Sequence, residues 1–153
     1  MDDDVAAFLA INRECEAQLW PATQAELRAM IGNAYRAMLS GDHQAMLIAF
    51  DERAPYDSPN FRWFQERYPR FVYVDRVAVS APARGRGHAR RLYEELMEAA
   101  RADGHTVICA EVYFDPPNPQ SDAFHEAMGF VEVGRAAVPD RGGKTVRYLV
   151  REL

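Results

Sequence analysis

The sequence has few cysteines, no long apolar run and no excess of positive charge. Its 153 residues contain only Cys15 and Cys109, too few for a disulfide framework and not spaced as a CxxC pair. We therefore expect a reducing compartment, the cytoplasm. The first four residues carry no positive charge, and the apolar stretch after them spans only 5–11. Neither a secretory signal nor a membrane-spanning helix is predicted.

The charge balance is acidic. Lysine and arginine number 18 against 23 aspartate and glutamate residues, which gives a formal charge of -5. Non-specific nucleic-acid binding needs a basic stripe, and a polybasic anchor needs clustered cations, so we expect neither nucleic acid nor a membrane as partner. The length and a hydrophobic content of 48% suit a single domain, 1–153, either monomeric or homodimeric.

Apolar periodicity and turn residues predict a mixed order of helices and strands. Residues 5–11 fit either a first strand or the turn into a helix. Helices are expected over 21–31, from Pro59, over 87–103 and from Asn118-Pro119; strands are expected over 34–39, 44–50, 71–80, 106–114, 130–138 and 145–153. This order indicates an α/β (α+β) fold with one mixed sheet.

Two segments contain residues that an ordinary core does not need. Residues 51–70 hold three prolines and five aromatic residues, which fits either a hydrophobic cluster under a long loop or a lid or substrate wall. Strand 71–80 is apolar on both faces except at Asp75 and Arg76. Buried charges are costly, so these two side chains either pair or contact a substrate.

The junction Arg84-Gly85-Arg86-Gly87-His88-Ala89 lies between the strongest predicted strand and the strongest predicted helix. Its glycines allow a close backbone approach, and the free N–H groups at a helix start suit a phosphate or pyrophosphate. Its arginines add positive charge for the same anion. A flexible turn with solvated arginines is the weaker interpretation.

Two common nucleotide motifs do not fit. A dinucleotide fingerprint needs a third glycine where Arg90 stands. A Walker loop needs GxxxxGK[ST]; Gly143-Lys144-Thr145 supplies its end, but Val138 stands at the first glycine and a strand pattern follows. We interpret Gly142-Gly143 as a hairpin turn.

Two motifs resemble signatures of the GNAT superfamily of N-acetyltransferases. Arg84-x-x-Gly87-x-Ala89 resembles the acetyl-CoA signature Q/R-x-x-G-x-G/A. Asn118-x-x-Ser121-x-x-Phe124-His125-x-x-x-Gly129-Phe130 resembles the second signature, N-x-x-A/S-x-x-F/L-Y-x-x-x-G-F. The spacing between the two motifs also fits, and together they cover residues 71–133.

The resemblance implies a mostly antiparallel sheet of six or seven strands with about four helices, splayed between the strands at 71–80 and 106–114. Acetyl-CoA would lie in that opening as co-substrate, with no metal. The implied cofactor residues are Val77, Ala78 and Val79 for the pantetheine arm, Arg84, Gly85, Arg86, Gly87, His88 and Ala89 for the pyrophosphate, and Asn118, Ser121 and Phe124 opposite. Asn118 equally fits a plain helix cap.

The resemblance also implies direct attack of an amine on the thioester. The amine must first lose a proton, and Glu111 resembles the glutamate that some family members use as base. A structural ion pair, for example with Arg76, is the equal alternative for Glu111. The oxyanion would meet a backbone N–H of 77–79.

His125 stands where the family usually has a tyrosine that protonates the leaving thiolate. An imidazolium is partly populated near neutral pH, so His125 fits that role; a partly exposed helix residue or a plain cofactor contact are the alternatives. His43, His88 and His105 show no metal-ligand spacing.

The predicted acceptor is a small-molecule or peptide amine. Tyr56, Asp57, Asn60 and Trp63 mix aromatic and polar character, which suits a cationic or aromatic amine, and Asp75 and Arg76 are the other substrate candidates. An acyl-CoA sensor without transferase activity is the alternative function, and a nucleotide-binding enzyme is a third.

Overall fold

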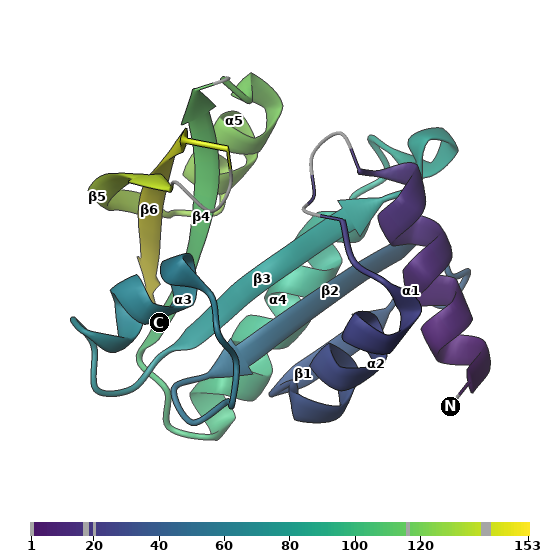
Figure 1. The fold of residues 1–153 in the computed structure, drawn as a ribbon, viewed down its shortest axis with the longest axis horizontal. Helices are drawn as coiled ribbons and strands as arrows, with labels where there is room; N and C mark the ends of the chain where they lie inside the picture. The colour runs from purple at the N-terminus through teal and green to yellow at the C-terminus, as the bar shows by residue number, and fades with distance from the viewer. Residues whose placement is uncertain (1, 17–18, 20, 116, 139–141) are drawn as a thin grey trace.

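The computed structural model forms a six-stranded mixed sheet with helices on both faces (Figure 1). It describes residues 2–16, 19, 21–115, 117–138 and 142–153. The strands are β1 Arg36–Leu39, β2 Ala45–Asp51, β3 Val72–Val79, β4 Val107–Asp115, β5 Val131–Val138 and β6 Lys144–Glu152. The helices are α1 Asp2–Glu14, α2 Gln24–Asn33, α3 Pro59–Gln65, α4 His88–Ala102 and α5 Pro119–Ala127, with a 3-10 turn η1 at Ala81–Ala83.

The predicted fold class is confirmed, with two differences in detail. The described residues contain five α-helices, where about four were expected. Residues 5–11 belong to α1 and not to a strand. Val5, Phe8, Leu9 and Asn12 are buried at the i, i+3, i+4, i+7 spacing of one helix face, whereas Ala6 and Ala10 are exposed. The alanines made this run look continuously apolar.

Local sequence explains where two helices begin. The Thr23 hydroxyl accepts the Glu26 N–H at 3.1 Å at the start of α2, and the Asn118 Oδ1 accepts the Ser121 N–H at 3.3 Å at the start of α5. Asn118 therefore has the predicted cap role. Gly142 and Gly143 adopt φ of +73° each, as a tight turn between β5 and β6 requires; residues 139–141 of that predicted turn lie outside the described residues.

The sheet order is β1-β2-β3-β4-β6-β5, and every neighbouring pair is antiparallel except β3 and β4. Helices α1, α2 and α3 cover one face, while α4 and the end of α5 cover the other (Figure 1). Strand β2 is buried on both sides: Met46, Ile48 and Phe50 belong to the first core, and Leu47 and Ala49 to the second. Strands β2 and β3 therefore lie between the two cores, in the middle of the fold.

The parallel pair β3 and β4 is joined for only two residue pairs. Val72 pairs with Ile108 and Tyr73 with Cys109, after which the strands diverge (Figure 1). The expected splay between the two central strands is therefore confirmed. The opening lies between the outer parts of β3 and β4, and the candidate site occupies it.

Candidate active site

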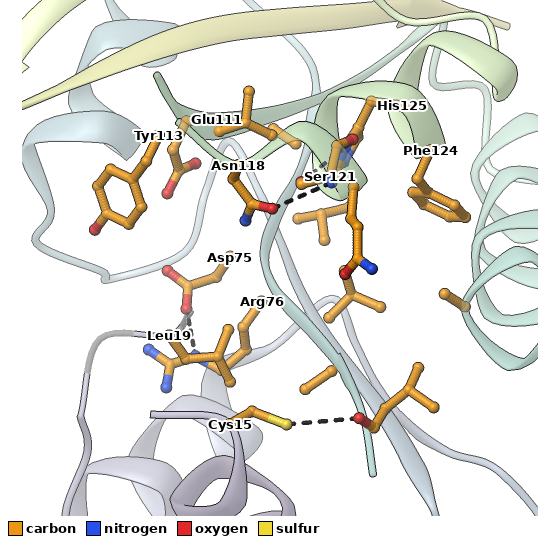
Figure 2. Close-up of a pocket in the computed structure, with 18 of the residues that line it drawn as sticks. Cys15, Leu19, Asp75, Arg76, Glu111, Tyr113, Asn118, Ser121, Phe124 and His125 are labelled. Carbon is orange, nitrogen blue, oxygen red and sulfur yellow. Dashed lines mark hydrogen bonds and ion pairs between the residues drawn. The ribbon is translucent and has the colours of Figure 1, made fainter. Parts of the chain in front are cut away.

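A cavity of about 410 Å³ occupies the opening between β3 and β4 (Figure 2). Its walls come from these two strands, the starts of α4 and α5, and residues near the end of α1. The cavity runs from the Arg84-Gly85 turn to Glu111, so the turn before α4 and a carboxylate share one space.

Most of the predicted cofactor residues line this cavity. They are Val77, Ala78, Val79, Arg84, Gly85, Ala89, Asn118, Ser121 and Phe124. Arg86, Gly87 and His88 are not among its lining residues. The Arg86 carbonyl accepts Arg91 Nη1 at 3.0 Å, and His88 Nε2 lies 3.7 Å from Asp42. The His88 side chain therefore lies toward Asp42 and not in the cavity wall.

The helix start at this junction has the geometry of an anion site. Gly85 and Gly87 have φ of +79° and +80°, in the left-handed region that glycine adopts without strain. Gly87 is the N-cap of α4, so the free N–H groups and positive dipole end of this helix lie beside the cavity. Arg84 Nε donates to the Val79 carbonyl at 3.2 Å, which keeps its guanidinium at the same end.

Glu111 lies on β4, two residues beyond the last pair with β3, and is half-buried. Its Oε1 accepts Asn60 Nδ2 at 3.2 Å. Burial and then the negative charge of Glu111 raise the pKa of Tyr148 to about 12, and the same two causes raise the pKa values of Tyr73 and Tyr93. These phenols stay neutral, so the carboxylate has neutral hydroxyl-bearing neighbours.

His125 is buried, at 4% exposure, and both of its ring nitrogens are engaged. Nδ1 lies 2.7 Å from the Ser121 carbonyl, which can only accept, so Nδ1 carries the proton. Nε2 then accepts the Tyr93 hydroxyl at 3.0 Å. Burial lowers the pKa of His125 below its ordinary value of 6.5. The partly exposed position that was one alternative for His125 is therefore wrong, and burial disfavours the imidazolium that the acid role needs.

The predicted substrate residues separate into two groups. Asn60, Asp75 and Arg76 line the cavity. Asp75 and Arg76 form the predicted pair, with Arg76 Nε 2.7 Å from Asp75 Oδ2, and Arg76 Nη1 also donates to Asn12 Oδ1 at 2.6 Å. The neighbours of Arg76 in this network come from β3 and α1.

The other predicted substrate residues do not line the cavity. Tyr56 donates to Asp75 and stacks on Phe50, with ring centroids 4.2 Å apart, so it lies behind the cavity wall. Exposed Asp57 pairs with Arg62. Trp63 stacks on Tyr148 at 4.2 Å. Tyr56 and Trp63 belong to the hydrophobic cluster that was the alternative interpretation of 51–70, because their rings pack against the first core.

The structure adds lining residues that the sequence did not single out. Tyr73, Tyr93 and Tyr113 bring hydroxyl-bearing rings to the cavity. Cys15, directly after α1, and Leu19 also line it (Figure 2). Tyr113 follows Glu111 by two residues on one strand, so strand alternation could have identified it. Cys15 gives no such signal, because its Sγ meets the Val79 carbonyl across 64 residues of sequence.

One cluster of possible metal ligands lies away from the cavity. Donor atoms of Asp51, Glu52 and His105 lie within 4.8 Å of one another, which the sequence spacing did not suggest. Arg70 Nε, 3.3 Å from Glu52 Oε1, already supplies a positive charge there.

None of the helices in the described ranges has the length and apolar character that crossing a membrane requires.

Comparisons with known proteins agree with this geometry. L-2,4-diaminobutyric acid acetyltransferase of Wolinella succinogenes is 27% identical over 93 residues, which is 61% of this chain and 54% of that protein. The chain thus spans about half the length of this curated relative. A ribosomal-protein-alanine N-acetyltransferase from Brucella melitensis has a TM-score of 0.72 at 23% identity, covering 100% of this chain and 96% of that chain.

The Salmonella typhimurium protein yncA, solved with its cofactor acetyl-CoA, has a TM-score of 0.70 at 20% identity, over 100% of this chain and 90% of that chain. At these identities the two structures show a shared fold. The model of the acetyltransferase (GNAT) family matches residues 9–130, which include both motifs and the cavity strands. This chain belongs to the acetyltransferase (GNAT) family.

Proposed function

We propose that this protein is an N-acetyltransferase that moves an acetyl group from acetyl-CoA to a primary amine of a small molecule or peptide, by direct attack in a ternary complex. The observation that carries this proposal is the single cavity that joins the start of α4 to Glu111. The diphosphate of the coenzyme would then lie at the start of α4 and the amine beside Glu111. The opening between β3 and β4 would separate them.

The residues of the opening fit acetyl-CoA. Backbone amides near Gly85 and Ala89 suit the pyrophosphate, and the exposed edge of β3 at Val77, Ala78 and Val79 suits the amides of the pantetheine arm. Asn118, Ser121 and Phe124 lie on the opposite wall. The thioester supplies an acyl group attached to a thiolate leaving group.

Glu111 is the proposed base. A primary ammonium gives its proton to the carboxylate, and the freed nitrogen forms a bond to the acyl carbon as the carbon–sulfur bond breaks. The backbone N–H groups of β3 along the opening are the proposed donors to the acyl oxygen. The nitrogen loses a second proton and the thiolate gains one, so the products are an amide and CoA.

His125 has a structural role in the proposed mechanism. The neutral ring has no spare N–H, since Nδ1 donates to Ser121 and Nε2 accepts from Tyr93. We therefore propose that His125 holds Tyr93 and the start of α5 in place, in preference to the acid role expected from the motif. This same observation favours the alternative function, an acyl-CoA sensor without turnover.

The acceptor is proposed from two sources. The similar proteins include an acetyltransferase of a diamino acid and one of a ribosomal-protein alanine, and both acceptors carry primary amines. In this chain, carboxylates of Asp75 and Glu111 line the acceptor end.

The free, buried cysteines Cys15 and Cys109 suit a reducing compartment, and we propose the cytoplasm.

The test is a thiol-release assay with a panel of amines. The protein is mixed with acetyl-CoA and amino acids, diamines or peptides with free N-termini, and both free CoA and the acetylated amine are quantified. Release of CoA in step with acetyl-amine supports the transferase. Acetyl-CoA binding without turnover on any amine supports the sensor, and binding of ATP but not of CoA would revive a nucleotide site.

A further inference from the structure

Asn60 is placed between the candidate base and a buried tyrosine. It lies in the first turn of α3 and is 3% exposed. Its Nδ2 donates to Glu111 Oε1 at 3.2 Å, and its Oδ1 accepts the Tyr148 hydroxyl at 2.8 Å. These three residues come from α3, β4 and β6, so Asn60 connects separate elements at the inner end of the cavity.

The Glu111 carboxylate, which only accepts, determines which way the Asn60 amide faces, and the Tyr148 hydroxyl then holds the amide oxygen. Tyr148 is 1% exposed, and its pKa is raised to about 12, so the phenol is neutral and can donate. An amide oxygen accepts and an amide nitrogen donates. Turning the amide over would place nitrogen against the hydroxyl and oxygen against the carboxylate, which would replace the amide's attraction to Glu111 with repulsion.

The ring of Tyr148 is itself held by packing. Trp63 stacks on it with an interplanar angle of 19° and a centroid separation of 4.2 Å. Trp63 fits there because residue 134 is glycine: a Cβ at Gly134 would lie 2.4 Å from the Trp63 Cζ2 atom. The register of β5 against β6 also shifts between Glu132 and Gly134. The contacts therefore run from β5 through Trp63 to the Tyr148 ring.

We propose that Asn60 is a positioning residue for Glu111, and that Tyr148 in turn orients Asn60. This inference rests on the proposed function, in which Glu111 is the base, and replaces a direct substrate contact as the role of Asn60. The donated hydrogen bond holds one carboxylate oxygen in a fixed place and stabilises the charged form that accepts a proton. Without it, the carboxylate would be less well aligned and would hold its proton to higher pH.

The experiment compares Asn60→Leu and Tyr148→Phe with wild-type protein. Leucine keeps the size of Asn60 without a donor, and phenylalanine keeps the ring that stacks on Trp63. Tyr35→Phe is the matched control, because it removes a phenol hydroxyl that donates to Asp103, outside the cavity lining. Thermal unfolding followed by circular dichroism checks that each variant is folded.

The main measurement is the pH titration of the Glu111 carboxyl by carbon-13 NMR, assigned by its loss in Glu111→Gln. We expect the Glu111 pKa to rise in Asn60→Leu, to rise less in Tyr148→Phe and to stay unchanged in Tyr35→Phe. An unchanged titration in folded Asn60→Leu overturns the proposal. If Asn60→Leu does not fold, an unchanged titration in Tyr148→Phe does so.

The second measurement is the pH profile of kcat/KM with an amine that the wild-type protein acetylates. We expect about a tenfold loss in Asn60→Leu, with its acid limb moved to higher pH and the KM for acetyl-CoA unchanged. A loss confined to KM for the amine would restore the direct substrate contact and overturn the positioning role. If the wild-type protein acetylates no amine, the proposed function fails, whereas the NMR titration still decides whether Asn60 controls Glu111.

Discussion

Asp75 and Arg76 are neighbours on β3, yet their side chains pair with each other at 2.7 Å. Successive side chains of a regular strand point to opposite faces. Here Ile48 of β2 pairs with Arg76 and Ala49 with Val74, so Asp75 is the extra residue of a β-bulge. The bulge turns both side chains toward α1 and the cavity, which explains how a strand can bury two charges.

The first prediction concerns this pair. Both side chains are only 6% exposed, so removing one partner leaves a buried charge. We expect Arg76→Met to lower the free energy of unfolding by about 3 to 5 kcal/mol, measured by urea denaturation. The double variant Arg76→Met with Asp75→Leu should recover much of that loss. A single variant as stable as wild type would contradict a structural role for the pair.

The second prediction concerns the turn before α4. Gly85 has φ of +79° and no atom within 4 Å of an added Cβ, so only backbone strain opposes alanine. The left-handed region costs an L-residue about 1 to 2 kcal/mol, and we expect Gly85→Ala to weaken acetyl-CoA binding about tenfold by calorimetry. Gly41→Ala is the control, because Gly41 also has open space but lacks the positive φ. Equal binding by both variants would remove the turn from the cofactor site.

Much of the fold was predictable because it depends on local patterns. The buried face of α4, made by Leu92, Tyr93, Leu96, Met97 and Ala100, follows helical spacing. The divergence of β3 from β4 was expected only from the family resemblance that the two motifs carry. The first helix was ambiguous, because exposed Ala6 and Ala10 look apolar in sequence but face away from the core.

The site was predictable where short motifs supply it, and not where tertiary packing does. Arg84, Gly85 and Ala89 line the cavity as expected, and Glu111 lies in its wall. Trp63 has the composition of a substrate wall, but its contact with Tyr148 joins residues 85 positions apart and is set by tertiary packing. The burial of His125 against Tyr93 of α4, which lowers its pKa, was equally hidden, since the motif does not show it.

The third prediction concerns stability and pH at His125. Its pKa in the folded protein lies below the ordinary value of 6.5, so the unfolded chain binds a proton more readily. The His125 contribution to stability is therefore intact above that value and declines as pH falls below it. We expect the free energy of unfolding to fall less steeply with decreasing pH in His125→Gln than in wild type, by urea denaturation across this range.

The same variant tests the role of His125 in turnover. Glutamine can still donate to Ser121 and accept from Tyr93, and we expect it to retain most of the activity. General acid catalysis contributes about 100-fold or more, so a loss of that size would establish His125 as the acid.

The fourth prediction concerns the base. Glu111→Gln keeps the size of the side chain but cannot accept the proton from the amine. We expect kcat to fall by about 100- to 10,000-fold, with unchanged affinity for acetyl-CoA by calorimetry. Glu98→Gln, at an exposed position of α4, is the control. Full activity of Glu111→Gln on a substrate of the wild-type protein would show that another group takes the proton.

The most direct measurement is a crystal structure of the protein grown with acetyl-CoA. The account predicts pyrophosphate oxygens at the backbone amides between Arg84 and Ala89, a pantetheine arm along β3, and the thioester between β3 and β4 beside Glu111. A coenzyme bound elsewhere on the surface, or an opening closed by Tyr93 and Tyr113 with no coenzyme in it, would contradict it.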